Sequence, residues 1–75
     1  MNDARRKKLK GYCDKIRDLI DNVNYIINEE QDSFDNLPEG FQDSERGEKM
    51  QESISSLEDA VDYMDSAISS MEEAC

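Results

Sequence analysis

Few side chains in this chain have the types and the spacing that catalysis or metal binding requires. Its 75 residues include two cysteines and no histidine. Cys13 and Cys75 are expected about 14 Å apart in an antiparallel helix pair, at about 1.5 Å per helical residue, whereas a disulfide needs Cα atoms within about 7 Å. Cys13 is therefore interpreted as a small core residue and Cys75 as a terminal thiol. Acids at helical spacing, such as Glu58, Asp62 and Asp65, are typical of a solvated face. The sequence predicts no enzyme activity, no metal site and no cofactor.

Charge is the strongest chemical signal, because basic residues gather near the start of an acidic chain. The formal net charge is −10. Most of the cations fall within residues 1–18, and they are Arg5, Arg6, Lys7, Lys8, Lys10, Lys15 and Arg17. Cations at a helix N-terminus oppose the helix dipole, so the cluster calls for a partner. One interpretation pairs residues 5–8 with Glu72, Glu73 and the C-terminal carboxylate. A second makes the cluster a phosphate-binding patch, and a third leaves it as a solvated face.

The phosphate-binding interpretation defines a candidate ligand site. Its residues are Arg5, Arg6, Lys8, Lys10, Tyr12 and Arg46. On a helix, Arg5 and Lys8 share one side, while Arg6 and Lys10 share another. We expect the Arg5 side to pair with the acidic C-terminal residues and the Arg6 side to remain free for an anion.

Two heptad stripes must position these residues. The first is Leu9, Tyr12, Ile16, Leu19, Val23 and Ile26. The second is Met50, Ile54, Leu57, Val61, Met64, Ile68 and Met71. Alternating spacings of three and four are typical of amphipathic helices packed along a seam. The sequence predicts an all-α fold, an antiparallel helical hairpin with helices over about 3–35 and 44–74 and a loop at 36–43, in a single domain.

The expected loop has its own pattern. Pro38 biases Leu37 away from helical geometry and so ends the first helix, and Gly40 can take a positive φ. Leu37 and Phe41 are expected to fold under the tip as a hydrophobic plug. Gly47 in the first turns of the second helix costs about 1 kcal/mol relative to alanine. It therefore indicates either a close backbone contact or a ligand.

The first helix carries more apolar surface than one partner helix can cover. A third column beside its stripe repeats every seven residues, and it is Cys13, Ile20, Ile27 and Phe34. The second helix has a flanking column of small residues, Ser53, Ala60, Ala67 and Ala74. Because an isolated pair of helices is marginally stable, we expect hairpins to self-associate into a helical bundle, at least as a dimer.

An uncharged belt is a second sign of association. Residues 22–28 and 53–57 contain no charge and are expected at about the same level of the hairpin. Neutral polar groups and an aromatic ring cost less to desolvate than carboxylates, which favours an interface around Tyr25. The alternative is that Asn and Ser simply fill exposed positions. The predicted interface residues are Ile20, Asn24, Tyr25, Ile27, Ser53, Ala60 and Ala67.

The loop and its flanks carry a resemblance to a known family. Residues 35–50 read DNLPEGFQDSERGEKM, after an NDARRKK start and before an acidic heptad helix. In this the chain resembles a family of short uncharacterised phage and prophage proteins of Gram-positive bacteria with an NLPEG-x-Q-x-SERGE loop. The resemblance covers nearly the whole chain, and the loop is its specific part. It implies an origin in a mobile element and a helical hairpin, but no reaction.

Three functions remain open. The chain can be a counter-defence interaction protein that sequesters, as an oligomer, a host immune component or a small anionic signal such as a cyclic nucleotide. It can instead be an acidic mimic that blocks a host nucleic-acid-binding protein, or a purely structural helical adaptor. No apolar run is long enough for a bilayer, and no apolar segment follows the basic start as in a signal peptide. We expect a cytoplasmic protein, in the host cell if it is phage-encoded, that binds neither membrane nor DNA directly.

Overall fold

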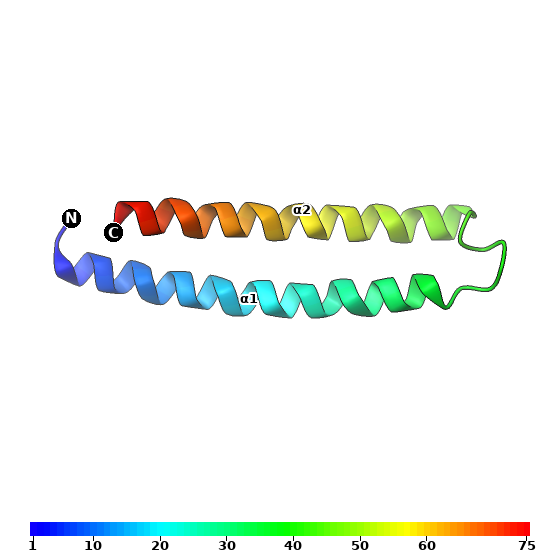
Figure 1. Ribbon diagram of the computed structural model, residues 1–75, viewed down its shortest axis with the longest axis horizontal. Coiled ribbons are helices and arrows are strands. Elements are labelled where there is room, and N and C mark those ends of the chain that lie inside the picture. The colour runs from blue at the N-terminus through cyan, green and yellow to red at the C-terminus, as the bar shows by residue number, and fades with distance from the viewer.

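The computed structural model describes residues 1–75 as two antiparallel helices joined by one loop (Figure 1). Helix α1 spans Asp3–Asp35 and helix α2 spans Glu45–Ala74. The helices lie side by side along their whole length, with both chain termini at one end of the rod and the loop at the other. The rod measures 58 × 15 × 11 Å. The predicted hairpin is confirmed, and its helix ends fall within one residue of the predicted ones.

Both helices begin at side chains that cap their first backbone N–H groups. The Asn2 side chain accepts a hydrogen bond from the Arg5 backbone N–H at 2.9 Å. The Ser44 hydroxyl accepts one from the Gly47 N–H at 3.4 Å. Such caps satisfy donors that have no partner within the helix. Acids in the first turns, among them Asp3 and Glu45, add a favourable interaction with the helix dipole.

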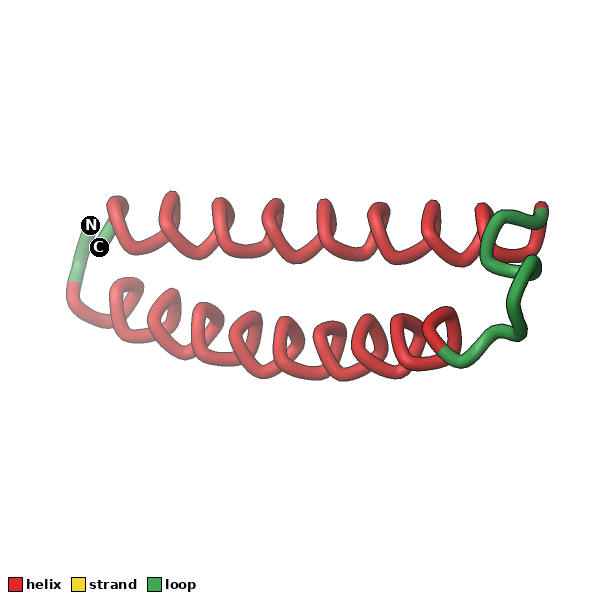
Figure 2. Tube along the Cα trace, turned by 45° about the vertical axis from the view of Figure 1, so that its right-hand side comes forward, coloured by secondary structure: helices red, strands yellow, loops and turns green.

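The loop leads from the end of α1 to the start of α2 (Figure 2). Two side-chain amides hold it to the end of α1. Asn36 donates from Nδ2 to the Asp32 carbonyl at 2.8 Å, and Gln42 donates from Nε2 to the Phe34 carbonyl at 3.2 Å. Each of these carbonyls also accepts a backbone N–H, that of Asn36 for Asp32 and that of Leu37 for Phe34, so each amide adds a second hydrogen bond. Gly40 has a φ of 88°, which confirms the predicted left-handed residue.

Gly47 is required by the loop backbone that passes over it. A Cβ atom at this position would lie 2.1 Å from the Gln42 carbonyl oxygen and 2.7 Å from that of Phe41. Both atoms belong to the backbone, so no side-chain rotation can make room. Of the two predicted explanations for Gly47, the close backbone contact is the one that the structure contains.

The seam uses a different pair of columns on α1 from the predicted one. Cys13, Ile20 and Phe34 of the third column are buried, whereas Tyr12, Leu19 and Ile26 of the predicted stripe are 51%, 55% and 54% exposed. Cys13 and Ile20 pack with Ile68 of α2. The other predicted stripe, on α2, does form the seam, with Ile54 and Ile68 buried.

Three adjacent apolar columns on α1 allow two different seams. The predicted first stripe was wrong in one of its two columns, that of Tyr12, Leu19 and Ile26, because the column of Leu9, Ile16 and Val23 is half-buried. The adopted seam buries Phe34 and Ile20, which carry no polar atom in the side chain. A seam along the predicted stripe would bury Tyr12 and would need a hydrogen-bond partner for its hydroxyl. Cys13 is confirmed as a small core residue.

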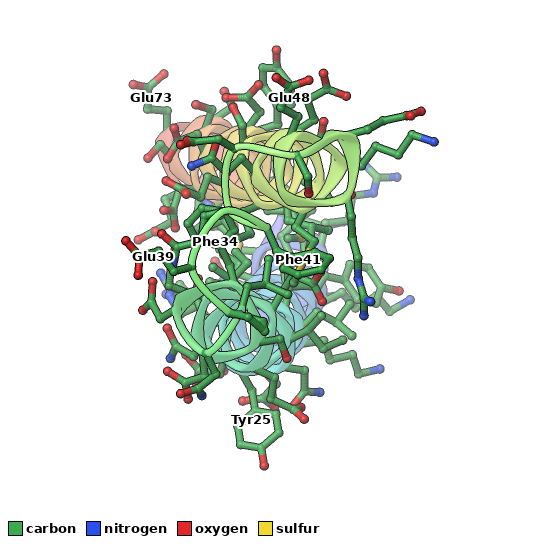
Figure 3. All side chains as sticks on the ribbon, turned by 90° about the vertical axis from the view of Figure 1, so that its right-hand side faces the viewer. Tyr25, Phe34, Glu39, Phe41, Glu48 and Glu73 are labelled. Atoms are coloured by element: carbon green, nitrogen blue, oxygen red, sulfur yellow. The ribbon has the colours of Figure 1, made fainter.

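The tip of the hairpin is closed by a different aromatic residue from the expected one. Phe34 is buried at the end of α1, but Phe41 remains 53% exposed, and Leu37 is half-buried. Figure 3, which views the rod from the loop end, shows both rings between the two helices. The expected plug of Leu37 and Phe41 is therefore wrong as regards Phe41. At this residue the backbone carbonyl, rather than the ring, makes the close approach to α2 beside Gly47.

Candidate functional site

The basic residues of α1 form fewer ion pairs than the sequence predicts. Arg17 donates to Glu72 at 2.6 Å and to Asp14 at 3.2 Å, and Arg6 pairs with Asp3 at 2.9 Å. Neither Arg5 nor any of the four lysines of α1 makes an ion pair. The predicted pairing of residues 5–8 with Glu72 and Glu73 is therefore wrong.

The register and the rotation of the helices together explain the difference. The Cys75 thiol lies 3.8 Å from the Arg6 carbonyl oxygen, so residues before Arg6 lie beyond the end of α2. Glu72 lies at the level of about Leu9, but on the flank of the seam that Arg17 shares, whereas Arg5 and Lys8 line a hollow on the other flank. Glu73 projects from the side of α2 that faces away from α1 (Figure 3). The open end of the hairpin consequently keeps cations without carboxylate partners.

An open hollow lies among these free cations. It has a volume of about 260 Å³ and is lined by Met1, Arg5, Lys8, Leu9 and Tyr12. The Lys15 ammonium lies 5.7 Å from the centre of the Tyr12 ring, and so makes a cation–π contact beside the hollow. The surface of the hollow is apolar throughout, so Arg5 and Lys8 line it with the aliphatic parts of their side chains and their charged groups lie outside it. Such a hollow suits the flat ring of a ligand whose negative charge reaches those outer groups.

The remaining predicted ligand residues lie elsewhere. Arg6 is paired with Asp3, and its Nε atom is buried without a hydrogen-bond partner. Lys10 lines a separate hollow on the opposite flank of the seam, next to Arg17 and Glu72. Arg46 lies near the loop, at the other end of the rod. Of the six predicted residues, the structure brings together Arg5, Lys8 and Tyr12. Met1 and Leu9 also line the hollow, and the pattern of charges does not indicate them because neither side chain is charged.

The predicted interface residues are also divided. Ile20 is buried between α1 and α2 of the same chain, and Ile27 is half-buried in that seam, so packing within the hairpin occupies both. Asn24 is exposed, and Tyr25 is exposed on the side of α1 opposite α2 (Figure 3). The small residues of α2 keep a flank position, with Ser53 and Ala67 exposed and Ala60 half-buried.

The cysteines are both free thiols. Cys13 is buried and Cys75 is exposed, and both line the hollow that also contains Lys10. No group of three or more His, Cys, Asp and Glu side chains lies close enough to hold a metal ion. Neither helix combines the length and the apolar character that a membrane span requires.

Comparison with known proteins finds no relative of this chain. No protein-family model, no curated protein and no solved structure matches the chain. The resemblance to short phage proteins, which depends on the loop residues around Pro38 and Gly40, therefore stays a prediction.

Proposed function

We propose that this chain is a non-catalytic, phage-type interaction protein that acts against host defence in the host cytoplasm. In this proposal it works as a self-associated helical bundle and sequesters a small anionic ligand, with cyclic nucleotides as the leading class. The observation that carries the proposal is the hollow at the open end. There Arg5 and Lys8 have no carboxylate partner and lie beside the apolar surface of Leu9 and Tyr12.

The chemistry of the hollow and its surroundings favours a nucleotide as the ligand. A nucleobase can stack on the Tyr12 ring, and a phosphate is attracted to the guanidinium and ammonium groups of Arg5 and Lys8. These side chains bind and orient a ligand, but none of them is paired with a general base or a nucleophile. Sequestration is therefore the activity that this hollow supports best.

A pair of charge-matched variants tests the ligand site. In the variant with Arg5→Gln and Lys8→Gln, the rise in melting temperature that a cyclic dinucleotide gives the unaltered protein should disappear. Lys7→Gln with Lys10→Gln removes the same charge from other faces of α1 and should keep that rise. Differential scanning fluorimetry at about 100 times the dissociation constant should show about 2.7 kcal/mol of ligand stabilisation. Equal loss in both double variants, or no shift for any nucleotide tested, would contradict the proposal.

The distribution of acids favours a second candidate, the mimic of a nucleic-acid backbone. Glu58, Asp65 and Glu72 recur every seven residues along one flank of α2, and Glu73 and Glu48 project away from α1 (Figure 3). Such rows can occupy the basic groove of a host nucleic-acid-binding protein.

Ionic strength distinguishes the mimic from the ligand trap. If a basic host protein binds through these rows, its affinity should fall by about tenfold or more between 50 and 200 mM salt, because dissolved ions screen the charges on both proteins. Glu58→Gln with Asp65→Asn should reduce both the affinity and its salt dependence, as measured by titration calorimetry. A host partner whose affinity is insensitive to salt and to these substitutions would rule out mimicry.

A further inference from the structure

The two flanks of the seam differ sharply in charge. The Arg17–Glu72 hydrogen bond shows that the heptad columns containing these two residues face each other on one flank. Each helix has one flank column on either side of its seam. The column of Leu19 in α1 and the column of Ala60 in α2 must therefore lie together on the other flank.

We call this second flank the acid-poor face. It consists of four columns that repeat every seven residues, two on α1 and two on α2. On α1 they are Arg5, Tyr12, Leu19, Ile26 and Ser33, and Met1 (just before the helix), Lys8, Lys15, Asn22 and Glu29. On α2 they are Arg46, Ser53, Ala60, Ala67 and Ala74, and Lys49, Ser56, Tyr63 and Ser70. Although the chain has 19 acids, Glu29 is the one acid in these four columns. The exposed large apolar residues concentrate here too, since Tyr12, Leu19, Ile26 and Tyr63 all belong to it.

We propose that the acid-poor face is the surface on which a second copy of this chain docks, face to face. The accessible area supports an occupant of this size. The hairpin exposes 5714 Å², whereas a folded protein of its mass is expected to expose about 4,700 Å². The excess of about 1,000 Å² compares well with the roughly 800 Å² that each partner buries in a standard interface.

Charge limits which surfaces of two copies can meet. Two chains that each carry a net charge of −10 repel each other, and carboxylates are costly to bury. When two acid-poor faces meet, almost every carboxylate stays on the outer surfaces, in water. The cations of the face, Arg5, Lys8, Lys15, Arg46 and Lys49, lie toward its two ends, and the stretch from Leu19 to Ile26, with Ala60 beside it, carries no charge between Lys15 and Glu29.

The sizes of the side chains fix the orientation of the two copies. Arg6 lies beside Cys75, and Cys13 packs with Ile68, so Leu19 lies at the level of about residue 62, between Ala60 and Ala67. By the same register Ile26 and Tyr12 also fall between successive small residues of the Ala60 column. Large residues of one copy can thus interdigitate with small residues of the other when α1 faces the partner's α2. A two-fold axis along the rod gives this arrangement and places both loops at the same end.

This assembly rests on the proposed function, because the ligand it would bind is the small anion proposed there. With both loops at one end, the two hollows that contain Arg5 and Lys8 lie next to each other at the opposite end. Each hollow is open on its own, and the second copy completes its wall. The ligand site is then shared between copies, with cations from both.

Matched variants test the face. Leu19→Asp and Tyr25→Asp both place an acid at an exposed apolar position of α1, 55% and 67% exposed. They therefore share the cost in helix propensity, but only Leu19 lies on the acid-poor face. Tyr25, a predicted interface residue, lies on the side of α1 opposite α2 and outside this face. Sedimentation equilibrium should show the dimer dissociation constant raised by about 100-fold or more for Leu19→Asp and changed less than threefold for Tyr25→Asp.

A distance measurement tests the orientation without disturbing the face. A spin label at Glu39→Cys in the loop, with Cys75→Ser to remove the exposed thiol, should give an intermolecular distance of about 20–30 Å, near the width of a four-helix bundle. A distance approaching the 58 Å length of the rod would overturn the arrangement. Dimers that Leu19→Asp leaves intact would overturn the face while self-association stands. A monomeric unaltered protein would overturn both.

Discussion

Replacing Gly47 with alanine is expected to cost about 3 kcal/mol of folding stability, enough to unfold much of a small hairpin. The added methyl group would lie 2.1 Å from the Gln42 carbonyl oxygen, inside the contact distance of any two such atoms. Since the obstacle is backbone, the loop must move away from α2. That movement would also strain the Gln42 hydrogen bond to Phe34. Chemical denaturation followed by circular dichroism measures the loss.

Gly11 supplies the matched control, because it is also a helical glycine. A Cβ atom there would meet nothing within 4 Å. Gly11→Ala should therefore stabilise the protein by about 1 kcal/mol through helix propensity. Opposite signs for the two substitutions are the expected result. A Gly47→Ala protein as stable as the original would show that the loop does not pack on α2 as described.

The second large effect is expected at Phe34. Its ring is buried at the loop end of the seam, and truncation to alanine typically costs 3–5 kcal/mol at a fully buried site. We expect about 3 kcal/mol here, because the tip of a two-helix rod can partly collapse into the space. Thermal melts at fixed protein concentration measure the change.

Phe41 is the control for Phe34, with the same side chain at the same end of the rod. It is 53% exposed, so Phe41→Ala should cost less than about 1 kcal/mol. The sequence predicted instead that Phe41 would be buried under the tip of the hairpin. A larger loss for Phe41→Ala than for Phe34→Ala would restore that expectation and contradict the structure.

Local backbone features were predictable from the sequence because each depends on neighbouring residues. The end of α1 follows from Pro38, and the positive φ of Gly40 follows from glycine's freedom there. Gly47 also signalled a close approach. The sequence could not tell whether a ligand or the loop made it, because that depends on where the chain returns.

Features that depend on the rotation and register of the helices were not predictable. Three apolar columns on α1 permit two seams, and the sequence alone did not show that Tyr12 lies on the exposed side. The pairing of Glu72 with Arg17 rather than with the first basic residues depends on the rotation of the helices, which puts Glu72 and Arg17 on one flank of the seam and Arg5 and Lys8 on the other. For the same reason the predicted ligand site is correct only in part. Of its six residues, Arg5, Lys8 and Tyr12 lie together.

The exposed stripe and the candidate ligand hollow are consequences of the same seam. Because Cys13 and Ile20 face α2, Tyr12 and Leu19 turn to the acid-poor face. That places the Tyr12 ring beside Arg5 and Lys8 at the open end. Self-association and ligand binding are therefore proposed on one continuous surface, and a substitution in its middle should affect both.

The mass of the unaltered protein in solution is the most direct test of this account. Sedimentation equilibrium at tens of micromolar should give about 17 kDa, twice the 8.6 kDa of one chain, or a higher even multiple. Dilution should lower the mass and the helical signal together, since each hairpin depends on its partner to cover the acid-poor face. A mass of 8.6 kDa with full helicity at that concentration would contradict the account.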